Sequence, residues 1–455
     1  MKLHVMGICG TFMGGIAALA REAGHEVEGT DQNVYPPMSD QLNSIGIRLR
    51  VGYQPQFISD ECQQVVIGNA LSRGNPAIEA VLNSGRDYVS GPQWLRDNVL
   101  VGRQVLAVAG THGKTTTSSL LAWILEHAGK APGFLIGGVP GNFPVSARTG
   151  DGECFVVEAD EYDTAFFDKR SKFVHYRPRV VVLNNLEYDH ADIFPDLTSI
   201  KQQFHHLIRC VPGNGRLIVN AEDFELDDVL SYGSWTPIER FAIDDSLQVE
   251  WGGRLLDPSG SRFAVRYQGL AEIEVSWSLL GRHNVMNALA AIAAAHAAGV
   301  TVHAAADALA GFKPPKRRLE RLLDRNGIRV YDDFAHHPTA IRTTLEGLRA
   351  SHPKARLIAV LEPRSNSMRL GAHAAALPES LAPADLSFML RRPELPWNAE
   401  ACISKLGGKG KALPDVDTLV RELHGELRSG DVVVLMSNGS FDGASRRLVE
   451  LLTKS

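Results

Sequence analysis

Gly110-Thr111-His112-Gly113-Lys114-Thr115-Thr116-Thr117 directly follows the apolar run Val105-Leu106-Ala107-Val108-Ala109. This order predicts a buried strand, a glycine-rich turn and the start of a helix. Backbone N–H groups in such a turn converge on phosphate oxygens, and the helix N-terminus adds positive potential. Lys114 would supply a point charge for the outer phosphates, and the Thr115 hydroxyl suits Mg²⁺. The stretch therefore predicts a nucleotide site formed by Gly110, Thr111, His112, Gly113, Lys114, Thr115 and Thr116.

The loop is shorter than the standard phosphate-binding loop, because only two residues separate its first glycine from the Gly-Lys pair. A structural glycine turn with a surface lysine is the alternative interpretation. Strand, Gly-Lys-Thr and helix occur in the required order, which favours the nucleotide site. The loop begins only at Gly110, so a further unit precedes it.

Length and composition restrict the class of protein. A chain of 455 residues exceeds a single core, and 44% hydrophobic residues with 42 glycines fit a multidomain α/β enzyme. A net charge of −5 argues against nucleic acid as a partner. The sequence shows neither a signal-peptide pattern nor an apolar stretch of membrane-spanning length, so we expect a cytoplasmic protein without a membrane partner. The scattered cysteines support neither disulfides nor a zinc site: Cys9, Cys62, Cys154, Cys210 and Cys402.

Alternating strands and helices predict an α/β fold of three domains with largely parallel sheets. We place a Rossmann-like domain at 1–102, a central P-loop ATPase-type domain with a β-rich addition at 103–313, and a C-terminal Rossmann-like domain at 314–455. Pro314-Pro315 marks the linker between the last two, because it stops the preceding helix. Beyond the phosphate loop, we predict strands at 154–157, 180–183, 216–219, 262–267, 272–277, 330–334, 357–361, 386–390 and 432–436, and helices at 284–298, 303–309, 340–349, 416–427 and 445–452.

The first domain begins with a predicted strand at 3–6, a glycine-rich turn at 7–15 and a helix at 16–23. A second strand ends at Asp31, as in dinucleotide-binding folds. However, Cys9 occupies the second glycine position of the dinucleotide fingerprint, so that fingerprint is not matched. The turn can still bind a phosphate-bearing ligand at the helix start, and a purely structural turn is the alternative.

Polar runs follow two predicted strands of the central domain. Glu158-Ala159-Asp160-Glu161-Tyr162-Asp163 comes after the first, and Asn184-Asn185-Leu186-Glu187-Tyr188-Asp189-His190 comes after the second. Carboxylates at strand ends beside a phosphate loop are placed to hold Mg²⁺, and a histidine there can ligate a metal or act as an acid or base. A solvated acidic loop and a structural histidine are the alternatives. The shared strand-end position favours the functional interpretation of Glu158 and His190.

The motif Gly281-Arg282-His283-Asn284, with Asn287 one turn later, starts an alanine-rich helix. Asparagine amides can pair with the edges of a base such as adenine. Helix capping by Asn284 is the alternative interpretation.

Tyr331-Asp332-Asp333-Phe334-Ala335-His336-His337-Pro338 ends a predicted strand of the third domain. Asp333 suits a ribose hydroxyl, and Arg317-Arg318 can reach a phosphate across a domain cleft. Exposed linker arginines are the alternative. The adjacent histidines do not favour zinc, because no cysteine or third histidine accompanies them.

Together these motifs resemble those of the Mur ligase family, which builds the peptide stem of bacterial peptidoglycan. They occur in the family's order over nearly the whole chain. Within the family, the chain is most similar to the ligases that join UDP-N-acetylmuramate to the murein tripeptide L-alanyl-γ-D-glutamyl-meso-diaminopimelate in peptidoglycan recycling. This similarity rests on residues 7–15, 34–39, 90–95, 166–176 and 361–368.

The resemblance implies ATP and Mg²⁺ as cofactors. In the family's reaction, ATP phosphorylates the lactyl carboxylate of UDP-N-acetylmuramate, and the alanine amine of the tripeptide then displaces phosphate. By motif, the catalytic residues are Lys114 at the β/γ-phosphates and Glu158 and His190 at a second Mg²⁺, while Thr115 holds the first. Adenine would meet Asn284 and Asn287, and the phosphates and ribose would meet Arg318 and Asp333.

The resemblance also implies the substrate contacts, and we expect the chain to act as a monomer. Arg364, Ser365 and Asn366 are candidates for gripping diaminopimelate, because they follow a strand end and arginine suits a carboxylate. Several sister ligases carry a carbamylated lysine where this chain has Phe204 and His205, so we predict no carbamate. The uridine diphosphate would be held by Gly10, Thr11, Gly14, Asp31 and Asn69.

Other functions stay open on the sequence alone. The nearest is the sister ligase that adds free L-alanine to the same sugar nucleotide, although it lacks the long segment around 166–172. A non-catalytic, nucleotide-gated binding protein is a second alternative, but it would not need a second metal site. A nicotinamide dehydrogenase is a third.

Overall fold

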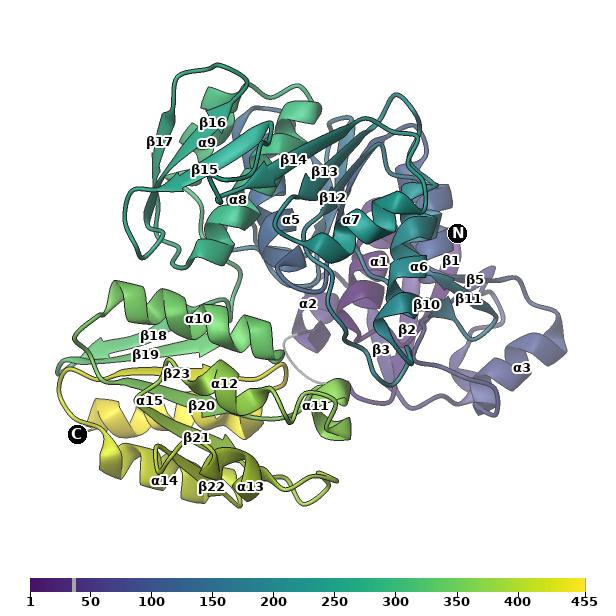
Figure 1. The fold of residues 1–455 in the computed structure, drawn as a ribbon. Helices are drawn as coiled ribbons and strands as arrows, with labels where there is room; N and C mark the ends of the chain where they lie inside the picture. The colour runs from purple at the N-terminus through teal and green to yellow at the C-terminus, as the bar shows by residue number, and fades with distance from the viewer. Residues whose placement is uncertain (35–37, 455) are drawn as a thin grey trace.

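Three α/β units follow one another along the chain, and each contains its own sheet of mainly parallel strands (Figure 1). The computed structural model describes residues 1–34 and 38–454, so residues 35–37 of the 34–39 motif lie outside the described residues. The sheets have five, ten and six strands, and a separate two-stranded hairpin belongs to the second unit. The predicted α/β fold with three parallel-sheet domains is confirmed.

The first unit is a parallel sheet with helices packed on it. Its strands are β1 (Lys2–Met6), β2 (Glu26–Asp31), β3 (Arg48–Val51), β4 (Gln64–Ile67) and β5 (Tyr88–Ser90), in the order β3-β2-β1-β4-β5, and its helices are α1 (Thr11–Glu22), α2 (Met38–Ser44), α3 (Pro76–Ser84) and α4 (Gly91–Leu95). Helix α1 begins at Thr11 with Gly10 as its N-cap, so the predicted start of this helix at residue 16 was too late. A Cβ on Gly15 would lie 2.1 Å from Leu135 Cδ1 of the second unit, so this glycine lets α1 pack against that unit.

The second unit places the phosphate-loop strand near the middle of a ten-stranded sheet. The strands are β6 (Gln104–Ala109), β7 (Gly133–Leu135), β8 (Ala147–Arg148), β9 (Cys154–Ala159), β12 (Val180–Leu183), β13 (Arg216–Asn220), β14 (Ile238–Ala242), β15 (Trp251–Leu255), β16 (Arg262–Tyr267) and β17 (Ile273–Ser276). Strand β6 lies between β12 and β9, and both pair with it in parallel. The predicted β-rich addition is confirmed, because β15, β16 and β17 form an antiparallel edge.

Helices of the second unit connect and cover this sheet. They are α5 (Lys114–His127), α6 (Leu197–Ile208), α7 (Phe224–Ser231), α8 (Arg282–Ala297) and α9 (Val302–Leu309). The hairpin of β10 (Asp163–Ala165) and β11 (Asp168–Ser171) is an element that the sequence patterns did not predict. It follows the acidic run at the end of β9 and leads into a short 3₁₀ turn over Lys172–His175.

The third unit is a six-stranded sheet that lies apart from the other two units in Figure 1. Its strands are β18 (Glu320–Arg325), β19 (Ile328–Asp333), β20 (Leu357–Leu361), β21 (Leu386–Leu390), β22 (Gly410–Leu413) and β23 (Val432–Met436), in the order β18-β19-β23-β20-β21-β22, and its helices are α10 (Pro338–Ser351), α11 (Asn366–Leu370), α12 (Leu377–Leu381), α13 (Ala399–Ser404), α14 (Val416–Glu426) and α15 (Ala444–Lys454). Only β18 runs antiparallel to its neighbour, through a tight turn at Asn326-Gly327.

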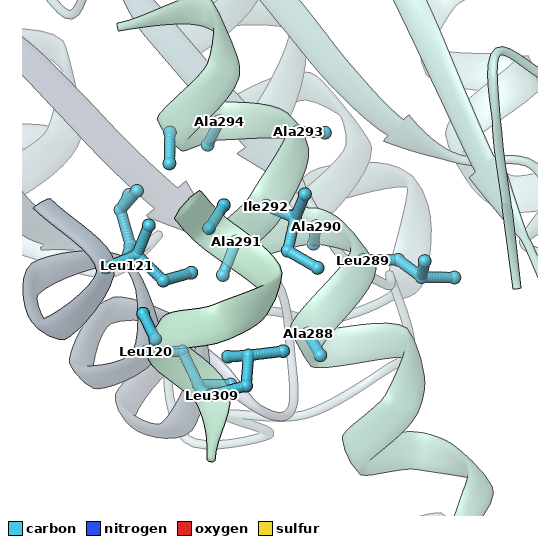
Figure 2. Close-up of a cluster of buried hydrophobic side chains, with 14 of the residues drawn as sticks. Leu120, Leu121, Ala288, Leu289, Ala290, Ala291, Ile292, Ala293, Ala294 and Leu309 are labelled. Atoms are coloured by element: carbon cyan, nitrogen blue, oxygen red, sulfur yellow. The ribbon is translucent and has the colours of Figure 1, made fainter. Parts of the chain in front are cut away.

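Helix α8 forms the centre of the second unit's core. Every residue from Ala288 to Ala295 is at most 1% exposed. Figure 2 shows this alanine-rich helix beside Leu120 and Leu121 of α5, with Leu309 of α9 in the same cluster. Small side chains all around α8 let the neighbouring helices approach closely, so the alanine composition is a packing requirement. Among the described residues, no helix is both long and apolar enough to cross a membrane, and all five cysteines are free thiols.

Ala291→Leu is expected to overpack the α5–α8 contact, because Ala291 is fully buried. We expect a loss of about 1–3 kcal/mol in the free energy of unfolding. The measurement is the thermal unfolding midpoint, with Ala310→Leu as the matched control, because Ala310 is exposed just after α9. An unchanged midpoint in Ala291→Leu would show that this helix contact is looser than the structure indicates.

Candidate functional site

The predicted strand, loop and helix around Lys114 are confirmed. Strand β6 ends at Ala109, and α5 begins at Lys114 with Gly113 as its N-cap. Gly113 has a φ of 79°, and a Cβ on it would lie 2.5 Å from Asn287 Oδ1 and 2.8 Å from Asn184 Nδ2. Any side chain would therefore collide with two buried amides as well as strain the backbone. The loop geometry requires glycine at this position.

A cavity of about 1320 Å³ lies over this loop and is lined by residues of all three units. The carboxyl ends of parallel strands open into it, which is where ligands bind in open α/β sheets. It brings together most of the predicted nucleotide and metal residues: Thr111, His112, Gly113, Lys114, Thr115, Thr116, Glu158, His190, Asn284, Asn287, Arg318 and Asp333. Of the predicted sugar-nucleotide residues, Thr11 lies on its wall, whereas Gly10, Gly14, Asp31 and Asn69 do not.

Lys114 lies among acidic side chains at the base of the cavity. Its Nζ donates to the Gly110 carbonyl at 2.7 Å and lies 3.5 Å from Glu161 and 3.8 Å from Asp160. Burial lowers the pKa of Lys114, but the surrounding carboxylates outweigh burial, and the net pKa is raised. The lysine is therefore a fixed positive charge at neutral pH, as phosphate binding requires.

The predicted metal residues have different partners. Glu158 Oε1 accepts the Gly137 N–H at 2.7 Å, and burial together with Asp160 raises the pKa of Glu158. His190 Nε2 lies 3.2 Å from Glu161 Oε1. Burial lowers the pKa of His190, but Glu161 outweighs burial and raises it overall. The sequence singled out Glu158 and His190 and missed Glu161.

The donor set fits a hard divalent cation. The carboxylate of Glu158 and the hydroxyl of Thr115 are oxygen ligands of the kind that Mg²⁺ prefers. The carboxylate of Glu161 has a buried oxygen, Oε2, that has no hydrogen-bond partner among the described residues. A cation here would also offset the mutual repulsion of Glu158, Asp160 and Glu161.

Asn284 and Asn287 lie on the first turns of α8, but Asn284 does not cap the helix. The N-cap is Gly281, so the capping alternative is wrong. Asn287 Oδ1 accepts hydrogen bonds from Thr117 Oγ1 at 3.1 Å and from Asn184 Nδ2 at 2.9 Å. Asn287 thus joins α5, the end of β12 and α8 beneath the phosphate loop. Contact with adenine stays a prediction for both asparagines.

The third unit reaches the phosphate loop through Arg318. Its Nη2 donates to Thr115 Oγ1 at 3.3 Å, and its guanidinium lies 4.8 Å from the centroid of Phe334. The alternative of an exposed linker arginine is therefore wrong for Arg318. Asp333 accepts the backbone N–H groups of Leu319 at 2.7 Å and Ala335 at 2.8 Å, so it also shapes the segment that carries Arg318.

A third histidine does accompany the His336-His337 pair in space. Ligand atoms of His112, Glu187 and His337 all lie within 4.8 Å of one another. Glu187 accepts from His112 Nε2 at 2.7 Å and from Thr339 Oγ1 at 2.8 Å, and His337 caps α10 by accepting the Thr339 N–H at 3.3 Å. Hydrogen bonds account for these groups, so the cluster is a polar contact between the second and third units.

In the first unit, the predicted sugar-nucleotide residues mainly support the glycine turn. Asp31 Oδ2 accepts the Cys9 N–H at 2.9 Å. Gly14 provides space for Met38, since a Cβ there would lie 2.4 Å from the sulfur. Asn69 lies just after β4, the strand beside β1, and therefore at the same edge of the sheet.

A second cavity of about 500 Å³ enters the third unit. Arg364, Ser365 and Asn366 line it, as the diaminopimelate hypothesis requires, but two of them are engaged elsewhere. Ser365 Oγ caps α11 by accepting the Met368 N–H at 3.3 Å, and Asn366 donates to Asp192 at 2.7 Å. Arg369, Arg392 and Glu394 also line the cavity and were missed by the sequence analysis. Arg392 follows the predicted strand at 386–390, so its strand-end position was the available signal.

Three family models cover most of the chain. They are the Mur ligase family catalytic domain over residues 2–100, the Mur ligase middle domain over 108–295 and the Mur ligase glutamate ligase domain over 317–439. The chain belongs to the Mur ligase family. It is therefore an ATP-dependent ligase, and the nicotinamide alternative is wrong.

Full-length relatives and a solved structure support the same family assignment. The chain is 52% identical to the UDP-N-acetylmuramate–L-alanyl-γ-D-glutamyl-meso-2,6-diaminoheptandioate ligase of Escherichia coli K12, covering 100% of this chain and 99% of that protein. A UDP-N-acetylmuramate–L-alanine ligase of Mycolicibacterium vanbaalenii is 31% identical, with 98% and 95% covered. The crystal structure of a murein peptide ligase from Psychrobacter arcticus superposes with a TM-score of 0.76 at 44% identity, covering 99% of this chain and 98% of that one.

Acidification is expected to destabilise the fold through three histidines, of which His337 is buried and His283 and His336 are half-buried. Burial lowers the pKa of His283 and His336 to about 4 and that of His337 to about 3. Below their unfolded pKa of about 6.5 the unfolded chain binds more protons than the folded one, so stability falls with decreasing pH. Each histidine contributes about 1 kcal/mol per pH unit between about pH 6 and pH 5.

Replacing one histidine isolates this effect. In urea unfolding across the same pH range, His283→Gln should lose about 1 kcal/mol per pH unit of the wild-type slope. His303→Gln is the matched control, because His303 is exposed on α9. Equal slopes in wild type and His283→Gln would contradict the lowered pKa of His283.

Proposed function

We propose that this enzyme joins UDP-N-acetylmuramate to L-alanyl-γ-D-glutamyl-meso-diaminopimelate in peptidoglycan recycling, as a monomer in the cytoplasm. Sequence supports this choice over the L-alanine ligase, because identity is 52% to the tripeptide ligase and 31% to the alanine ligase described above. The observation that carries the proposal is the second cavity. A ligase for free L-alanine needs little space beyond the reacting amine, whereas about 500 Å³ accommodates a peptide.

The two cavities meet where the reaction must occur. Both are lined by Asp189, His190, His336 and Asn438. An acyl phosphate formed above Lys114 and an amine that enters from the third unit would come together at these four residues. Proximity of the two reactants is itself a large part of the catalytic effect.

The residues around Lys114 would stabilise the phosphorylation step. A lactyl carboxylate oxygen bonds to the γ-phosphorus while the bond to ADP breaks. Lys114 and Arg318 would offset negative charge on the transferred group, as electrostatic catalysis requires. We propose that Thr115, Glu158 and His190 hold Mg²⁺, which supplies further positive charge when bound.

Amide formation would use the junction residues. The alanine nitrogen bonds to the acyl carbon, loses a proton, and inorganic phosphate leaves. Asn438 Oδ1 is buried without a hydrogen-bond partner among the described residues, so it can accept from the incoming amine. Asp189 accepts hydrogen bonds from Ser367 Oγ at 2.5 Å and from the His190 N–H at 2.7 Å. These bonds fix its side chain at the junction of the two cavities.

A panel of amine donors tests the proposal. With UDP-N-acetylmuramate and ATP, we expect ADP release and a new amide with the tripeptide and little of either with free L-alanine. The measurement is coupled ADP release with product mass. Turnover of L-alanine without turnover of the tripeptide would instead establish the sister activity.

Lys114→Ala should reduce kcat by about 100-fold or more, because it removes a charge that stabilises the transferred phosphoryl group. Binding of UDP-N-acetylmuramate, measured by calorimetry, should be retained. Lys354→Ala, at an exposed lysine beyond α10, is the control. Full turnover in Lys114→Ala would overturn the catalytic assignment and revive the binding-protein alternative.

A further inference from the structure

The wall of the second cavity carries several charged side chains. Arg364, Arg369 and Arg392 line it, and the acids among its lining residues are Asp189 and Glu394. Asp189 and His190 also line it, and they line the nucleotide cavity as well. A peptide with its reacting amine near His190 would therefore have its remaining charged groups in a cavity that the arginines line.

Arg392 is held rigidly by carboxylates behind the wall. Glu362 is 0% exposed and accepts from Arg392 Nη2 and from Ser437 Oγ, the latter at 2.5 Å. Asp442 lies 2.8 Å from the same Nη2. Both contacts use one nitrogen, and no hydrogen bond or ion pair of Nε or Nη1 is found in the described part of the chain. One edge of a fixed guanidinium is thus available for a ligand carboxylate.

The loop that carries Arg392 and Glu394 is attached to α11, which carries Arg369. Trp397 Nε1 donates to the Met368 carbonyl at 2.8 Å. The indole also packs tightly on Gly371, where a Cβ would lie 3.0 Å from Trp397 Cδ1. This contact keeps the acid of the loop and the arginine of the helix on one wall at a set separation.

Glu394 has no role in holding that wall together. Among residues 1–34 and 38–454, no hydrogen bond or ion pair joins its carboxylate, although three guanidiniums line the same cavity. A wall built only to bind carboxylates would be weakened by an adjacent negative charge, because like charges repel. An acid beside arginines is instead the arrangement that complements an ammonium group next to a carboxylate.

We infer that this wall recognises a zwitterionic amino-acid head at the far end of the peptide, with Arg369 and Arg392 binding its carboxylate and Glu394 its ammonium group. The inference rests on the proposed function and adds the selectivity for the last residue of the peptide. The distal centre of meso-diaminopimelate carries both groups. L-Lysine at that position lacks the distal carboxylate, and L-2-aminopimelate lacks the distal ammonium.

Peptides that end in diaminopimelate, lysine or 2-aminopimelate allow the distal carboxylate and the distal ammonium group to be tested separately. The peptides are L-alanyl-γ-D-glutamyl-X, where X is meso-diaminopimelate, L-lysine or L-2-aminopimelate, and the measured quantity is kcat/KM. Wild type should prefer diaminopimelate over either analogue by about tenfold, the value of one charge-assisted contact. Glu394→Gln should abolish the preference over 2-aminopimelate and keep the preference over lysine.

Arg369→Gln should keep the preference for diaminopimelate over 2-aminopimelate. It should lower the preference over lysine at least about threefold, while Arg392 still binds the carboxylate. Arg392 itself is left unchanged, because its removal would leave the buried Glu362 unpaired and would risk misfolding. Glu400→Gln is the matched control, since Glu400 lies just beyond the same loop and pairs with Arg391 outside the cavity.

The outcomes distinguish a failure of the zwitterion inference from a failure of the proposed function. If wild type joins the peptides but the ratios in Glu394→Gln equal those of wild type, the zwitterion inference is overturned and the proposed function stands. If wild type joins none of the three peptides while it accepts L-alanine, the proposed function is wrong and this inference fails with it.

Discussion

The close contact of Gly113 with two buried amides is the constraint on which the site depends. Asn287 comes from α8 and Asn184 from the end of β12, and they hydrogen-bond to each other directly against the loop. Because Asn287 also accepts from Thr117, the same amide fixes the first turn of α5. The buried alanine-rich part of α8 directly follows Asn287 and fixes its position. The orientation of Lys114 and Thr115 towards the cavity is therefore set by packing that lies behind them.

Acidic and basic side chains alternate in a network of ion pairs around this loop. Glu161 lies between Lys114 and His190, and Asp160 lies between Lys114 and a second buried lysine, Lys172. Lys172 Nζ also lies 4.2 Å from the ring centroid of Tyr162, on the hairpin side. These ion pairs offset part of the negative charge of the carboxylates. A nucleotide and a cation would replace these internal pairs rather than enter an uncompensated field.

Strand ends were the part of the site that the sequence could predict. Glu158 and His190 each follow an apolar run, and the parallel sheet brings the ends of such strands to one edge. The fold class followed from the same runs. Weakly apolar edge strands such as β18 and β22 were missed, since they are only partly buried and carry charged residues. Their formation depends on a neighbouring strand that is distant in sequence.

Partners from separate units could not be predicted from spacing. His112 and His337 are far apart in sequence, and Glu187 joins them only after the second and third units have come together. Arg392 is similar, because its orientation depends on Glu362, just after β20, and on Asp442, in the 3₁₀ turn that precedes α15. Arginine after a strand is common, and Arg392 is distinguished only by its contacts with the carboxylates of Glu362 and Asp442.

The way in which the units are joined explains where the cavities lie. The first and second units share one hydrophobic cluster, to which Leu19 of α1 and Phe155 of β9 both belong, whereas the third unit has clusters of its own. The contacts of the third unit with the second include polar ones beside the phosphate loop, such as Arg318 with Thr115 and Ser367 with Asp189, and only Leu280 of the second unit packs against the third unit's described core. Polar interfaces between domains permit relative motion, whereas a shared apolar core does not. The first and second units are therefore held together by a common core, and movement of the third unit would open both cavities at their common junction.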